Sequence, residues 1–153
     1  NDMSSLCHVY LCSRELTDEY AQVLSFSSQS FSKSFQSSPC KTFMHWSLEL
    51  CYDNGKTYLC EANEDKGKLK SLIRGSSGED KTMTKLNPQK VYLGKHLIEK
   101  GRLMDLSAEL DTDEDYNPVT NNCQHFVKKL LKKLGIDFMN HLSMVDRLIL
   151  NIM

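Results

Sequence analysis

The alternation of apolar and polar residues is clearest between Phe43 and Ala62, in the stretch FMHWSLELCYDNGKTYLCEA. Successive side chains of a strand point to opposite faces. The apolar face of the first strand carries Met44, Trp46, Leu48, Leu50 and Tyr52. The other face carries His45, Ser47, Glu49 and Cys51. Asn54-Gly55 is a preferred pair in two-residue type I′ turns, so the stretch predicts a β-hairpin with its apolar face toward the core.

A helical period follows between Cys123 and Leu134, in the segment CQHFVKKLLKKL. Its apolar stripe consists of Phe126, Val127, Leu130, Leu131 and Leu134, and its polar stripe of Lys128, Lys129, Lys132 and Lys133. This separation is typical of an amphipathic helix packed on a core. Pro118 disfavours helix immediately before it, either Asn121 or Asn122 can be the N-cap, and Gly135 suits the left-handed C-terminal position.

Weaker patterns predict the remaining elements. We expect strands at 8–16 and 91–93, a helix from Thr17 to Leu24, helical packing at 97–106 with Gly101 as a break, and a second apolar helix at 141–152. Leu69, Leu72 and Ile73 fit either a short helix or a strand. The serine- and phenylalanine-bearing segment 25–38 predicts a packed loop, and the acidic run 111–115 a solvated loop. The fold class expected is α+β, an antiparallel sheet packed against the cysteine-bearing helix.

Length and charge narrow the function classes. The 153 residues are expected to form a single domain, 1–153, with its own core. The net charge of −1 argues against a nucleic-acid binder. No signal-peptide pattern and no run long enough to span a bilayer is present, so a cytoplasmic location is expected, and membrane association would need segments outside these residues.

The six cysteines are scattered along the chain. They lack the dense spacing of a small secreted scaffold, and no pair of C-x-x-C units is present for a structural zinc. We therefore expect reduced thiols, no metal and no cofactor.

Cys123 is the candidate nucleophile because it falls in the first turn of the predicted helix. The free N–H groups and the helix dipole at that end favour a thiolate. The alternative is a small core residue, since free cysteine is often buried.

A cysteine nucleophile also needs a base. His125 is two residues along the helix, about 200° around its axis, and therefore points away from Cys123. His45 is the best of the other histidines, ahead of His8, His96 and His141, because it lies on the polar face of a well-defined strand; a plain solvent-facing histidine is the alternative. We predict the Cys123 sulfur within roughly 3–5 Å of His45, at a sheet edge or end. A two-residue turn would also place Glu64 across from His45, as a candidate third residue that orients the imidazole.

Two blocks of the sequence resemble known families. His45-Trp46 on a strand, followed by Asn122-Cys123-Gln124-His125-Phe126-Val127 at a helix start, resembles the lecithin:retinol acyltransferase-like proteins of the circularly permuted papain-like superfamily, which also holds the NlpC-type peptidases. Tyr116-Asn117 ahead of Asn122-Cys123 is similar to the PPPDE-type isopeptidases. Gln124 stands where the acyltransferase-like motif usually has glutamate, and a second hairpin histidine is missing.

The resemblance implies a circularly permuted papain-like fold and acyl transfer through a thioester on Cys123. His45 would act as base and then as acid, and the backbone N–H of Cys123 would contribute to an oxyanion hole. The expected function is a cysteine-dependent hydrolase of a peptide or isopeptide bond, with a protein, peptide or acyl substrate. The alternatives are a lipid or thioester acyltransferase, or an interaction module of the same fold without catalysis. The sequence fixes neither the substrate nor the oligomeric state.

Overall fold

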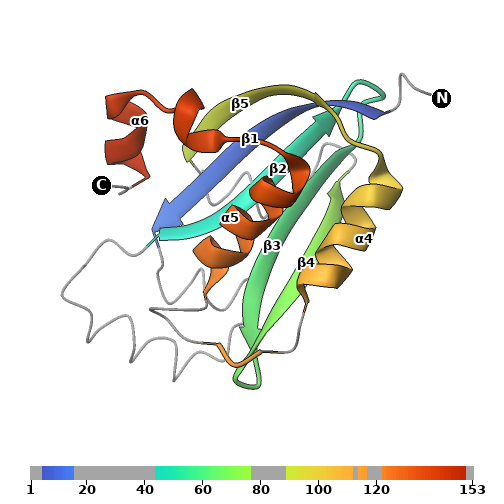
Figure 1. Ribbon diagram of the computed structural model, residues 1–153, viewed down its shortest axis with the longest axis vertical. Helices are drawn as coiled ribbons and strands as arrows, with labels where there is room; N and C mark the ends of the chain where they lie inside the picture. The colour runs from blue at the N-terminus through green and yellow to red at the C-terminus, as the bar shows by residue number, and fades with distance from the viewer. Residues whose placement is uncertain (1–4, 16–43, 77–88, 112–113, 117–121, 151–153) are drawn as a thin grey trace.

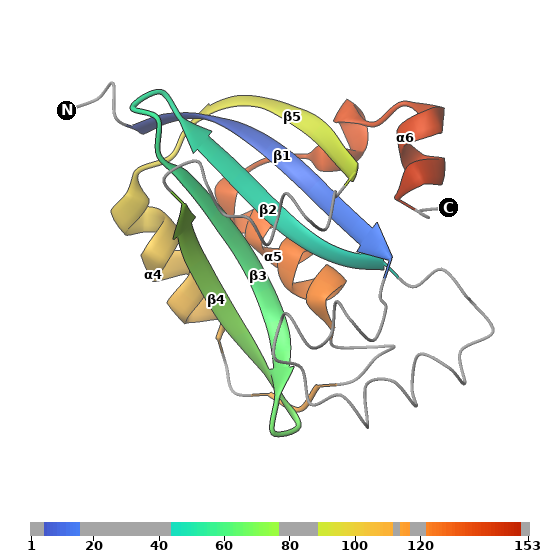
Figure 2. The same cartoon turned by 180° about the vertical axis from the view of Figure 1, so that it is seen from behind.

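The computed structural model describes residues 5–15, 44–76, 89–111, 114–116 and 122–150. In these ranges five antiparallel strands form one sheet with the order β4-β3-β2-β1-β5. The strands are β1 (Leu6–Glu15), β2 (Met44–Tyr52), β3 (Thr57–Asp65), β4 (Lys68–Ser76) and β5 (Gln89–Leu97). Helices α4 (Lys100–Leu110) and α5 (Cys123–Leu134) lie on one face of the sheet (Figure 1), and Figure 2 shows the opposite face with both helices behind it. The α+β class and the sheet packed on the cysteine-bearing helix are therefore as expected.

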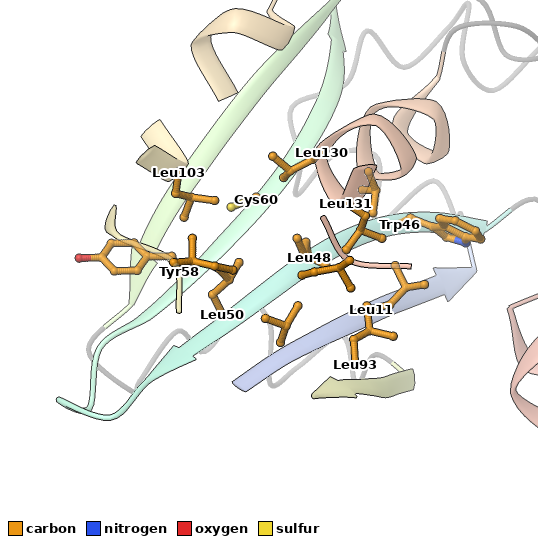
Figure 3. Close-up of a cluster of buried hydrophobic side chains, with 14 of the residues drawn as sticks. Leu11, Trp46, Leu48, Leu50, Tyr58, Cys60, Leu93, Leu103, Leu130 and Leu131 are labelled. Carbon is orange, nitrogen blue, oxygen red and sulfur yellow. The ribbon is translucent and has the colours of Figure 1, made fainter. Parts of the chain in front are cut away.

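The core forms between the sheet and α5, as the two amphipathic patterns predict (Figure 3). It includes the apolar face of β2 and the buried stripe of α5, both at most 5% exposed: Trp46, Leu48, Leu50, Tyr52, Phe126, Val127, Leu130 and Leu131. Trp46 also meets the ring of Phe138 edge-on, with ring centroids 6.1 Å apart. Burial of these side chains stabilises the fold by roughly 1.5–3 kcal/mol each.

The ends of α5 match the sequence closely. Of the two candidate asparagines, Asn122 is the N-cap: its side chain accepts the N–H groups of Gln124 and His125, and the His125 side chain returns a bond to the Asn122 backbone. Gly135 ends the helix with φ of 76°, in the left-handed region that glycine favours. These caps fix where the helix begins, and so where Cys123 lies.

The hairpin of β2 and β3 is present, but its predicted turn is wrong. The Tyr52 N–H donates to the Lys56 carbonyl at 2.8 Å, which leaves a three-residue loop. Gly55 takes φ of 89° and closes that loop as a bulge. Leu48 consequently pairs with Cys60, a register one residue away from the one that a type I′ turn sets.

Most of the other predicted elements differ in length or type. The strand near 8–16 is β1, and 68–76, where a helix and a strand were both open, forms the strand β4. The helical packing expected from Leu97 begins later, at Lys100 of α4, because β5 extends through Leu97. Gly101, expected to be a break, lies within the first turn of α4. The helix predicted at 141–152 is shorter, α6 (Met144–Ile149), and follows the 3₁₀ turn η2 (Phe138–His141). The helix from Thr17 and the loop 25–38 lie outside the described residues.

Candidate functional site

The site lies where two central strands separate. Hydrogen-bonded pairing of β2 with β3 runs from Cys51–Thr57 to Leu48–Cys60. From there β2 stays paired with β1 as far as Met44, and β3 stays paired with β4 as far as Asp65. Figures 1 and 2 both show β2 and β3 diverging toward this end, with the N-terminal end of α5 beside the opening. The cysteine helix therefore begins at a fork between the second and third strands of the sheet, beside the end of β2 that carries His45, and not at an outer edge of the sheet.

His45 projects into this fork and is paired with Glu61 of β3. Its Nε2 lies 3.0 Å from Glu61 Oε2, and the two residues are 1% and 0% exposed. The other carboxylate oxygen of Glu61 is 3.4 Å from Arg74 Nε. Burial of a carboxylate costs free energy unless the charge is paired, so His45 and Arg74 together stabilise the buried carboxylate of Glu61. His45 is thus not a solvent-facing histidine.

The third residue predicted from the turn, Glu64, is not the partner of His45. Side chains alternate along β3, so Glu64 falls on the face of Cys60 and Ala62, whereas Glu61 falls on the face of His45. The one-residue change in the hairpin register is the physical cause. Counting from a three-residue loop places Asn63 opposite His45 and Glu61 two residues away on the same face, so that count brings Glu61 within reach of His45 and leaves Glu64 on the other face.

Cys123 meets the same imidazole. Burial opposes the charge on His45, but the charge of Cys123 and its side-chain hydrogen bond, with further contributions from Glu61, raise the pKa of His45 to about 9. Since Glu61 occupies Nε2, Nδ1 is the nitrogen left to exchange a proton with the Cys123 sulfur. The structure therefore brings together the two residues that the sequence singled out and adds Glu61 behind them.

His125 serves the helix cap instead. Its Nδ1 lies 2.9 Å from Asn122 Oδ1 and accepts the Asn122 backbone N–H at 3.3 Å. Burial and the nearby charges of Lys128 and Lys129 lower the pKa of His125, which favours the neutral imidazole. The sequence expectation that His125 points away from Cys123 fits this role.

The remaining histidines have other partners. His8 Nδ1 is 2.7 Å from the Tyr92 hydroxyl, and His96 Nε2, within β5, is 2.9 Å from the Leu93 carbonyl. His141 is exposed in η2. Neither of these contacts involves the thiol of Cys123, so among these histidines His45 is the one that contacts Cys123.

The other described cysteines are free thiols in different surroundings. Burial raises the pKa of Cys7 to about 11 and that of Cys12 and Cys60 to about 12. Burial also raises the pKa of Cys51, and Glu49 adds to the rise. The raised pKa values favour the protonated, less nucleophilic form of these four thiols at neutral pH.

The described ranges hold no group of three or more histidine, cysteine or acidic side chains that could bind a metal ion. Nor does any helix in that part of the chain have the length and apolar character needed to cross a membrane. The chain matches no family model, and no curated protein and no solved structure is significantly similar to it. The resemblance drawn from residues 43–62 and 116–135 is therefore carried by those residues alone.

Proposed function

We propose that this protein is a cysteine-dependent hydrolase that cleaves a peptide or isopeptide bond through a thioester on Cys123. The observation that supports the proposal is the chain of contacts from Cys123 to His45 and from His45 to Glu61. A nucleophile, a base and a group that orients the base are the parts that thiol catalysis needs. The order of these parts, with the histidine strand before the cysteine helix, also supports a circularly permuted papain-like fold.

Acylation would begin with the thiolate attacking the carbonyl carbon of the substrate. The carbonyl π electrons move to oxygen, and the resulting tetrahedral intermediate collapses as the C–N bond breaks. The imidazolium of His45 gives its Nδ1 proton to the departing amine. Glu61 holds Nε2 and keeps the ring oriented through both steps.

Deacylation would use the same histidine in the opposite role. Neutral His45 removes a proton from water, the hydroxide oxygen attacks the thioester carbonyl, and the C–S bond breaks to restore the Cys123 thiolate. If an alcohol or amine takes the place of water, the same thioester leads to acyl transfer, so the two outcomes share one acyl-enzyme.

Alkylation of Cys123 by iodoacetamide tests the first part of the proposal. Rates are measured from pH 5 to 10 for the wild type and for His45→Gln, with the labelled residue identified by mass spectrometry. Because His45 stays protonated up to about pH 9, we expect Cys123 at pH 6 to react at least tenfold faster than a free thiol with a pKa of about 8.5, and the variant to lose that advantage. A wild-type rate equal to that of a free thiol would refute the proposal and favour an interaction module.

The acyl-enzyme is tested separately with p-nitrophenyl acetate. We expect one acetyl group on Cys123, removable by hydroxylamine and missing in Cys123→Ala. Release of acetate to water alone supports a hydrolase, whereas transfer to an added alcohol or amine in preference to water assigns the protein as an acyltransferase and overturns the hydrolase.

A further inference from the structure

The buried carboxylate of Glu61 has two cationic partners, one at each of its oxygens. Nε2 of His45 lies 3.0 Å from Oε2, and Nε of Arg74 lies 3.4 Å from Oε1. Glu61 is fully buried, whereas the side chain of Arg74 is 28% exposed on β4. A carboxylate buried this deeply keeps its charge only beside a cation. The charge of Glu61 is therefore shared between an imidazole that titrates and a guanidinium that stays charged at every working pH.

The register of β3 and β4 explains why Arg74 meets this carboxylate. Glu61 pairs with Leu72, so Arg74 is a diagonal neighbour two residues along β4, on the same face of the sheet. Two other cations occupy neighbouring positions on that face, Arg14 opposite His45 and Lys70 diagonal to Glu61 beyond Leu72. Arginine and lysine do not titrate near neutral pH, so neither cation changes its charge when His45 does.

With Arg74, the charges along this chain of contacts sum to zero in both main states of the proposed cycle. Before acylation, the Cys123 thiolate and Glu61 are balanced by the imidazolium of His45 and by Arg74. In the acyl-enzyme the thioester and the neutral imidazole carry no charge, and Glu61 is balanced by Arg74 alone. Without Arg74, a neutral His45 would leave Glu61 as an unpaired buried carboxylate, which costs free energy. The His45–Glu61 pair would then retain its proton.

We propose that Arg74 is a positioning residue that neutralises Glu61 whenever His45 is uncharged, and so allows the imidazole to release its proton and to accept one from the attacking water. The inference rests on the proposed function, because it deepens the same reaction. Arg74 acts through Glu61 and touches neither the thiol nor the substrate. Its contribution therefore falls on the step that needs a neutral imidazole, which is hydrolysis of the thioester.

p-Nitrophenyl acetate separates that step from acylation. The Cys123 thiolate displaces p-nitrophenolate, which leaves without a proton, in an initial burst. Hydrolysis of the acetyl thioester needs neutral His45 and then sets the steady-state rate. We expect Arg74→Gln to change the burst rate by about twofold at most and to move the low-pH limb of the steady-state rate up by about one pH unit, so that the rate on that limb falls about tenfold. The plateau at high pH should stay the same, because the ring is neutral there in both proteins.

An NMR titration tests the same effect without catalysis. Cys123→Ala removes the thiolate charge, as acylation would, and serves as the background. In it we expect Arg74→Gln to raise the pKa of His45 by about one unit and Arg74→Lys, which keeps the positive charge, to restore most of the difference. Arg102→Gln is the matched control, since Arg102 donates to the Lys133 carbonyl at 3.2 Å, and it should leave the titration unchanged.

The inference is refuted if Arg74→Gln leaves the pKa of His45 unchanged, or if it slows hydrolysis by the same factor at every pH, as a merely structural residue would. Thermal unfolding reports whether each variant is folded. If Arg74→Gln does not fold, Arg74→Lys decides: it should keep the low-pH limb of the wild type, and a shifted limb would contradict a role of the charge. If the wild type gives no burst, the proposed function fails instead, and the titration still tests Arg74.

Discussion

Replacing Glu61 with glutamine is the sharpest test of how the site is held together. The variant keeps the size of the side chain and a hydrogen-bond acceptor for His45, but removes the negative charge 3.0 Å from Nε2. A hydrogen bond to a charged group contributes about 1.5–3 kcal/mol and a neutral one about 0.5–1.5 kcal/mol, so the imidazolium loses about 1–1.5 kcal/mol. At 1.36 kcal/mol per unit, the pKa of His45 should fall by about one unit.

The assay is an NMR titration of the His45 imidazole, identified from the signal that disappears in His45→Gln. Cys123→Ala should lower the pKa of His45 more than Glu61→Gln does, because Cys123 contributes more than Glu61 to the rise to about 9. Glu64→Gln is the matched control, and we expect no change in the pKa of His45, since Glu64 faces the other side of β3.

Two results would contradict this reasoning. If Glu61→Gln leaves the titration of His45 unchanged, the ion pair does not determine the charge of the imidazole. If Glu64→Gln lowers the pKa of His45 as much as Glu61→Gln does, the hairpin register in solution is the one that a two-residue turn would give.

Two further predictions concern stability. The pKa of His45 is 6.5 in the unfolded chain and about 9 in the fold, so protonated His45 contributes about 3 kcal/mol to the free energy of unfolding below about pH 6.5, and this contribution is lost as the pH rises through 9. Urea unfolding from pH 6 to 10 should show a steeper loss of stability with pH for the wild type than for His45→Gln, and equal slopes would contradict the prediction. Asn122→Ala removes the acceptor of two helix N–H groups and should destabilise the protein by about 1 kcal/mol and slow alkylation of Cys123, whereas Ser143→Ala at the cap of α6 should change only stability.

The parts predictable from sequence are those set by local period and caps. The alternation from Trp46 to Tyr52 determined the core face of β2, and the stripe of α5 with Asn122 and Gly135 determined where the cysteine helix begins and ends. These features depend on residues that are close in sequence. For the same reason the pairing of Cys123 with His45 was within reach, because each residue could be placed on an element and a face.

The partner of His45 was not predictable because it depends on whether the loop between β2 and β3 has two residues or three. Asn54-Gly55 favours two-residue turns, yet here Gly55 adopts the left-handed conformation of a bulge, and Asn54 Oδ1 accepts the Lys56 N–H at 3.0 Å. The free-energy difference between such turns is small compared with the burial of Trp46 and Leu48, so tertiary packing chooses the register. The fork between β2 and β3 likewise involves segments far apart in the sequence, since α5 packs on both strands, and no local pattern encodes it.

The pKa of His45 connects this geometry to the proposed catalytic cycle. The charge of Cys123 is the largest contribution that raises the pKa of His45, to about 9, so in the proposed cycle the imidazolium would be present at neutral pH and would protonate a leaving group. Acylation would convert the thiolate into a neutral thioester and remove that contribution, while the desolvation of a ring that is 1% exposed would remain. The pKa of His45 must then fall, which favours the neutral imidazole needed to activate water. Glu61, 3.0 Å from Nε2, would still favour the charged ring and so limit that fall. In the proposed cycle, His45 would therefore act first as an acid and then as a base at a single pH, because the charge of Cys123 is lost on acylation while the charge of Glu61 remains.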